Sequence, residues 1–340
     1  MSDESRPTRL LQLVPALTLN MAIALAAAIP LTGVLIRYRA NYSPKVVQLE
    51  GDDVAAQGRK GPAVSGYFSM LARVYRLEGW AGLYKGTMPA VLVSLVAITY
   101  HAIRFIILGN ASLPGAQPLT EVGIWTRLGR SVLWMLVMLP VTILSSRAIT
   151  TPYKLPFFGL KQSLHTLLTP TERSRPWVLY LTPGLMVATS LEIVVTVVSI
   201  MCVERNLLPE LPKSREAIDA MFILKSLMYL AAVVISTTVV VPLEVMKARL
   251  AIQRNHASYD SLPSQEERRA ALGEPPVYPR AVNEDVIGFR DEADPYTSFI
   301  DCAKRMIGEE GWSTMFRAWW ISFLPLLAAG ISMMFVEKKV

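Results

Sequence analysis

The chain has 340 residues, of which 52% are hydrophobic and only 18% are charged, and its formal net charge is +7. This apolar excess is more than a soluble domain needs and indicates a lipid environment. The basic residues lie in loops between apolar stretches, which argues against nucleic-acid binding. The two cysteines and three histidines are scattered, so we expect no disulfide framework, metal site or other cofactor.

Six apolar stretches are long enough to cross about 30 Å of hydrocarbon. They predict transmembrane helices at 10–36, 87–108, 124–146, 177–202, 222–245 and 318–336. The loops after the first, third and fifth stretches are long and carry most of the lysines and arginines, so we expect them on the side from which insertion is controlled. Within these loops, the polar, proline-rich segment 255–295 predicts a disordered insertion, and 46–62 predicts a smaller insertion.

An internal repeat accompanies these helices. Near the end of each odd-numbered stretch a proline is followed seven residues later by an arginine: Pro30 and Arg37, Pro140 and Arg147, Pro242 and Arg249. Because a proline inside a helix removes one backbone hydrogen bond, we expect three kinks at one depth. A turn with glycine, aromatic and basic residues follows at 78–86 and 310–318, and in degenerate form at 177–184. These patterns predict three repeats, at 1–120, 121–215 and 216–340.

The segment 242–253, with Pro242, Glu244, Lys247, Arg249 and Gln253, resembles the signature of the mitochondrial carrier family. The three repeats extend this resemblance over essentially the whole chain, as a diverged member. It implies an all-α membrane protein in which six transmembrane helices, in three two-helix repeats, form a pseudo-three-fold bundle around a central cavity. It also implies a multi-pass location in the mitochondrial inner membrane, transport of a small solute by alternating access, and contact with the bilayer, including cardiolipin at the matrix-side helices.

The resemblance also implies a gate on the matrix side that contains Glu244, Lys247, Arg249 and Gln253. In the family, ion pairs between neighbouring repeats close this gate. Here only the third copy has charged residues, Glu244 and Lys247, at both pairing positions. A ring of three such pairs is therefore impossible, and we expect Glu244 and Lys247 to face neutral neighbours or each other.

Substrate contacts in the family lie about two turns into each even-numbered helix. Counting from Gly86, Gly184 and Ala318, the candidates here are Val93, Ser94, Leu191, Glu192 and Pro325. None is a cation, so we expect neither a nucleotide nor a dicarboxylate as substrate. Glu192 is an ionisable residue inside an apolar stretch, which suits a cationic or amino-bearing solute. Alternatively, Glu192 is protonated or hydrogen-bonded within a bundle that does not transport.

Two functions therefore remain open. The first is an inner-membrane carrier of a small solute, which the third signature favours. The second is a non-transporting, carrier-like protein of the outer membrane that acts in mitochondrial fusion or morphology, or as a receptor or insertase, which the missing gate charges favour. No nucleophile and base pair, phosphate loop or metal-ligand spacing indicates an enzyme.

Overall fold

The structure is a computed structural model that describes residues 5–44, 64–108, 123–153, 155–156, 159–202, 220–255, 285–291 and 294–335. In these ranges all regular structure is helical. The long helices are α1 (Ser5–Ala40), α4 (Thr87–Leu108), α5 (Ile124–Thr150), α8 (Leu185–Cys202), α9 (Ala220–Ile252) and α12 (Trp319–Phe335). Between them lie α3 (Tyr67–Leu83), α6 (Leu160–Leu167), α7 (Pro170–Ser174) and α11 (Phe299–Glu309), with the 3-10 turns η2 (Pro176–Leu181) and η5 (Trp312–Phe316).

Four of the described helices are long and apolar enough to cross a membrane. These spans are Ala22–Ala40, Ile124–Thr150, Leu185–Cys202 and Met221–Ile252, and α4 adds the shorter apolar stretch Thr87–Val96. Along α8, exposed apolar side chains follow one another at helical spacing: Val187, Leu191, Val194 and Val198. Since a stripe of this kind is stable when lipid covers it, the chain is a membrane-embedded helical protein.

The long helices begin and end close to the predicted limits, with two informative differences. α4 has the predicted bounds, whereas α8 begins at Leu185 and not at 177. That prediction was wrong because Pro183 and Gly184, whose φ is +77°, separate η2 from the helix. α1, α5 and α9 continue four to seven residues beyond their predicted ends. Their last turns contain buried arginines, which a search for apolar residues passes over.

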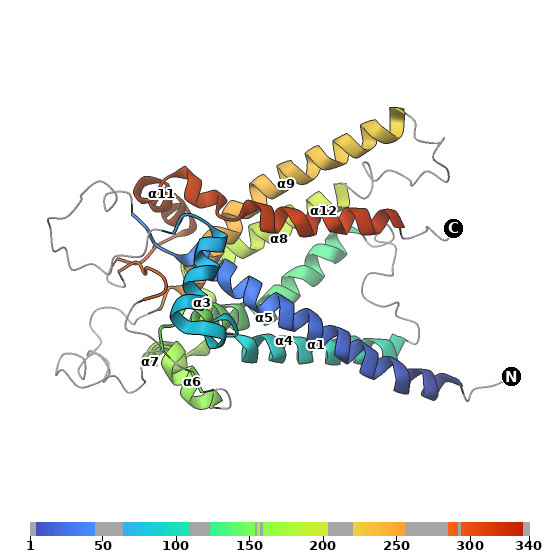
Figure 1. Ribbon diagram of the computed structural model, residues 1–340, viewed down its shortest axis with the longest axis horizontal. Helices are drawn as coiled ribbons and strands as arrows, with labels where there is room; N and C mark the ends of the chain where they lie inside the picture. Colours follow the sequence, from blue (N-terminus) through green and yellow to red (C-terminus); the bar gives the residue numbers. More distant parts are fainter. Residues whose placement is uncertain are drawn as a thin grey trace.

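The short helices gather at one end of the molecule (Figure 1). α3, α6, α7 and α11 lie there, while the N-terminal end of α1 and the C-terminal end of α12 lie at the opposite end (Figure 1). The C-terminal turns of α1, α5 and α9 reach the short-helix end, and each of these three helices contacts the other two. Pro140 and Pro242 are inside continuous helices, as is Pro30 within the bounds of α1.

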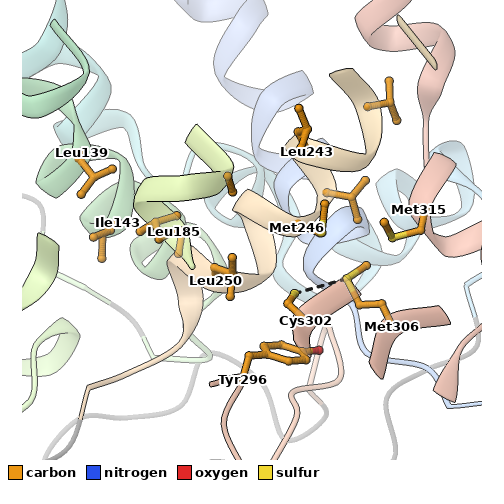
Figure 2. Close-up of a cluster of buried hydrophobic side chains, with 14 of the residues drawn as sticks. Leu139, Ile143, Leu185, Leu243, Met246, Leu250, Tyr296, Cys302, Met306 and Met315 are labelled. Atoms are coloured by element: carbon orange, nitrogen blue, oxygen red, sulfur yellow. Dashed lines mark hydrogen bonds between the residues drawn. The ribbon is translucent and has the colours of Figure 1, made fainter. Parts of the chain in front are cut away.

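Buried apolar side chains join the helices near this end. Figure 2 shows the larger cluster, in which Leu139 and Ile143 of α5 meet Leu185 of α8 and residues of α9 and α11. Cys302 lies within it, with its Sγ 3.7 Å from Sδ of Met306. A second cluster joins α1 and α3 to Ile287, which precedes α11 in the sequence.

The expectation of a disordered insertion at 255–295 is wrong for residues 285–291. These residues are packed, and Ile287 is only 1% exposed. The polar composition of the whole segment concealed a short apolar stretch, Val286, Ile287 and Phe289, which packs against the second cluster. Residues 256–284, 292–293 and the predicted insertion at 46–62 lie outside the described residues.

Candidate functional site

Three buried ion pairs stand at the ends of α1, α5 and α9. The arginine that follows each proline by seven residues binds a glutamate from the segment after its own helix. Arg37 pairs with Glu78 at 2.6 Å, Arg147 with Glu172 at 2.6 Å, and Arg249 with Glu310 at 2.6 Å. All six side chains are at most 3% exposed. We call these six residues the arginine ring.

Each arginine of the ring also binds a neighbouring helix. Arg37 Nε donates to the carbonyl of Ile149 at 2.9 Å, which ties α1 to α5. Arg147 Nη2 donates to the carbonyl of Gln253 at 2.6 Å, just beyond α9. Arg249 Nε donates to the carbonyl of Arg39 at 2.9 Å, which returns the connection to α1. The three arginines thus link α1, α5 and α9 in a closed cycle.

None of the three glutamates was predicted as an arginine partner, and Glu172 also lies outside the turn predicted for its repeat at 177–184. In the first and third copies the glutamate precedes the turn residue, Gly86 or Ala318, by eight positions, but Glu172 precedes Gly184 by twelve. A capping box fixes its place: Thr169 Oγ1 accepts from the Glu172 amide at 3.2 Å, and Glu172 Oε2 accepts from the Thr169 amide at 3.0 Å. The Thr-x-x-Glu sequence at the start of α7 is the signal that could have identified it.

The electrostatics of the ring follow from its burial. Burial alone would raise the pKa of the Glu172 carboxyl, but its hydrogen bonds to Arg147 and the charge of that guanidinium hold the pKa below its ordinary value. At Glu310 burial also raises the pKa, but the charges of Arg249 and Arg317 lower it more, so the pKa of Glu310 is below its ordinary value. Burial lowers the pKa of Arg317 to about 10, helped by the nearby charge of Arg249. The Glu172 and Glu310 carboxyls are therefore charged at neutral pH.

The charged gate residues of α9 have partners that the resemblance did not predict. Glu244 pairs with Arg39 of α1 at 2.9 Å and accepts a hydrogen bond from Ser322 of α12. Lys247 pairs with Glu192 of α8 at 2.5 Å. The expectation that Glu244 and Lys247 face neutral neighbours or each other was wrong, because Arg39 and Glu192 lie at positions outside the family's pairing pattern. α9 is thereby joined to α1 on one side and to α8 on the other.

The other two predicted gate residues lie apart from these pairs. Arg249 belongs to the arginine ring. The Gln253 side chain makes two bonds with the backbone of Tyr296: its amide donates to the carbonyl at 3.0 Å and its oxygen accepts from the amide at 3.1 Å. Of the four predicted gate residues, the structure thus puts Arg249 in the arginine ring and Gln253 against Tyr296, and it pairs Glu244 and Lys247 with Arg39 and Glu192.

Among the predicted substrate contacts, Glu192 forms an ion pair, and its partner is Lys247. Ser94 is half-buried, and its hydroxyl donates to the carbonyl of Ala90 within α4 at 2.9 Å. Val93 is half-buried beside it, whereas Leu191 and Pro325 are exposed. Glu192 and Lys247 are thus the pair that could bind a polar solute.

A cavity of about 650 Å³ lies between α3 and α4 on one side and α5 and α6 on the other. Its walls are mainly apolar, with Leu92, Leu144 and Leu164 among them, and Glu78 of the arginine ring borders it. Such a lining suits hydrocarbon rather than a charged solute.

No group of three or more His, Cys, Asp or Glu residues in the described part of the chain could hold a metal ion. Comparison with models of known protein families finds no match, and comparison with curated proteins finds none that is significant.

Proposed function

We propose that this protein is a diverged carrier-like membrane protein that moves a small solute by alternating access. In this proposal six transmembrane helices form three two-helix repeats around a central cavity, and the arginine ring closes the bundle at the short-helix end. The closed cycle of arginines is the observation that carries the proposal. Three equivalent arginines, each bound to its own glutamate and to the next helix, are what a three-fold arrangement of one repeated unit requires.

The proposed substrate is a small amino-bearing solute. In the closed state the Lys247 ammonium binds the Glu192 carboxylate, with 2.5 Å between Nζ and Oε2, and both side chains are partly exposed. An amino group that reaches Glu192 would take the place of the lysine ammonium, which frees α8 from α9 at this level. Partly exposed ion pairs are weak, so a competing ligand can break this one. Substrate binding and gate opening would then be one event.

The proposed location is the mitochondrial inner membrane, with the short-helix end toward the matrix. The lysines and arginines of the long loops support this orientation through the positive-inside bias. The apolar cavity between α4 and α6 supports the predicted lipid contact, for which cardiolipin is the proposed ligand.

The test is solute exchange in liposomes that contain the purified protein. We expect uptake of at least one radiolabelled amino acid or small amine from a defined panel, and we expect Glu192→Gln to abolish it. Asp301→Asn, which changes a partly exposed carboxylate on α11, is the matched control and should retain uptake. Absence of uptake across the panel by folded protein would count against transport.

A second candidate is the non-transporting protein of the outer membrane that serves as a receptor, an insertase or a factor in mitochondrial fusion or morphology. One observation favours it: the short-helix end is held by three deeply buried ion pairs, which are costly to break. In that case Glu192→Gln would leave folding and partner binding intact.

A further inference from the structure

Residues 285–291, which we call the strap, cross the end of the bundle where α1, α5 and α9 meet. Their backbone is held by fixed partners. The Gly288 amide donates to Asn41 Oδ1 at 2.8 Å, and the Gly288 carbonyl accepts from the Tyr42 amide at 3.0 Å. Arg73 of α3 donates to the carbonyls of Asp285 and Val286, both at 3.1 Å. A segment with this many satisfied backbone groups has a defined position.

Apolar burial holds the strap in place as well. The Ile287 side chain is 1% exposed and packs into the cluster of α1 and α3 that contains Val34, Met70 and Val74. Val286 and Phe289 pack against the same cluster. The strap therefore adds a hydrophobic anchor from the segment after α9 to the helices at the start of the chain.

The charged end of the strap is tied to α11. Arg290 donates to Glu309 at 2.5 Å and to Asp294 at 2.6 Å. Its guanidinium carbon lies 4.9 Å from the centre of the Tyr296 ring, within the range of cation–π attraction. Tyr42, which follows α1, binds the same Glu309 through its hydroxyl at 2.9 Å.

The strap also borders α5 and α9 across small gaps. A space of about 10 Å³ separates Asp285, Val286 and Phe289 from Thr150 and Thr151, with Arg37 of the arginine ring also at its wall. A second space of about 70 Å³ lies between Phe289 or Arg290 and the end of α9 at Ile252 and Gln253. One segment of seven residues thus bonds to α3 and to the residues just after α1, and it borders the ends of α5 and α9.

We propose that the strap is a built-in closure of the short-helix end, and that this end opens only when the strap leaves its seat. The helices that must separate for a solute to pass are the ones that the strap bridges. The inference rests on the proposed function, since only a carrier needs this end to open, and it assigns a regulatory element to that carrier. An event that displaces the strap would permit transport, and a seated strap would prevent it.

The test measures access to a residue beneath the strap. Thr151 is 5% exposed and borders the 10 Å³ space, so Thr151→Cys introduces a thiol that the strap should shield. Purified full-length protein in micelles is treated with a maleimide, and mass spectrometry of peptides follows labelling at position 151. Ile287→Asp places a charge in the apolar seat and should expel the strap, while Ile287→Val is the matched control.

We expect labelling at position 151 to be at least tenfold faster with Ile287→Asp than with Ile287→Val, and Arg290→Gln to give a smaller increase. If Ile287→Asp does not fold, the comparison of Arg290→Gln with the parent decides. Unchanged labelling in the folded variants, or fast labelling in the parent itself, would overturn the inference. Labelling needs no solute, so its result is separate from that of the uptake assay. Uptake in liposomes with unchanged labelling would reject the strap alone. Faster labelling without uptake would reject transport, and with it the closure role, but would still show that the strap covers position 151.

Discussion

At the scale of single residues, the three buried arginines of the ring are the side chains whose partners matter most for stability. Each of Arg37, Arg147 and Arg249 is at most 3% exposed and depends on one carboxylate for its charge balance. A buried pair contributes little compared with an apolar replacement of both partners, but removal of one partner strands the other in a medium of low dielectric. The ring is therefore the part of the chain where conservative substitutions should cost most.

We expect Glu172→Gln to lower the free energy of unfolding by about 3 kcal/mol, because it leaves Arg147 charged and buried without a counter-ion. Thermal unfolding of the purified protein in detergent would measure the change. Asp294→Asn is the control, since Asp294 is mainly exposed and its loss should change the midpoint little. An equal loss of stability in the two variants would contradict the claim that burial makes the Arg147 and Glu172 pair costly to break.

The lowered pKa values of Glu172 and Glu310 predict an acid-sensitive fold. A carboxyl whose pKa is lower in the folded state stabilises the fold above its ordinary unfolded pKa, near 4.5, and this stabilisation is lost as the pH falls through the folded value. We expect the unfolding temperature to be steady from pH 8 to about 5 and to fall below that. In Glu172→Gln the unfolding temperature should fall less steeply below about pH 5. The same fall in the variant and the parent would contradict a role for Glu172 in this pH dependence.

At the scale of elements, the turns into the even-numbered helices share a residue with a positive φ. Gly86 and Gly184 have φ of +86° and +77°, and Ala318 takes φ of +55° at the corresponding place. Positive φ is uncommon for a residue with a side chain. Three left-handed turns at matching positions show how strongly the local geometry is repeated, even where the sequence has changed.

These turns predict opposite effects of two exchanges. Ala318→Gly should stabilise the protein by about 0.5 kcal/mol, because it relieves the positive φ. Gly184→Ala should destabilise it by about 2 kcal/mol or more, since the added Cβ would lie 2.4 Å from the backbone nitrogen of Phe299. Unfolding midpoints of the two variants against the parent provide the measurement, and a shift in the same direction for both would contradict the argument.

At the scale of the whole molecule, the arginine cycle puts the C-terminal ends of α1, α5 and α9 at one end of the bundle. The segments that follow α1 and α9 must then leave from the same side of the membrane. This conclusion uses only the hydrogen bonds of the ring and does not depend on the cellular location.

We expect protease sites inserted at positions 45–63 and 256–284 to be cut or protected together. In the inner-membrane orientation both are protected in intact mitochondria and become accessible only after the inner membrane is breached. Immunoblots of tagged protein from intact mitochondria, from mitoplasts and after detergent would show this. Cleavage in intact mitochondria would indicate the outer membrane and favour the non-transporting candidate. Cleavage of the two sites from opposite sides of the membrane would contradict the arrangement of α1 and α9 in the bundle.

The sequence by itself determined the long helices, the positions of the three prolines and arginines, and the turns before α4 and α12. These features are local, since hydropathy over about 20 residues selects a membrane helix and a glycine or proline interrupts it. The repeat of 102 to 110 residues between the prolines was also readable, because it needs only positions along the chain.

Only the tertiary structure decided which charges meet. The pairing of Lys247 with Glu192, of Glu244 with Arg39, and of Arg147 with Glu172 depends on how helices distant in the sequence are rotated against one another. The seat of Ile287 likewise lies on α1 and α3, more than 200 residues earlier. Composition averaged over 255–295 predicted a polar loop. The packing of Ile287 and the hydrogen bonds of Gly288 depend instead on a site that other helices form, so the composition of the segment alone could not predict them.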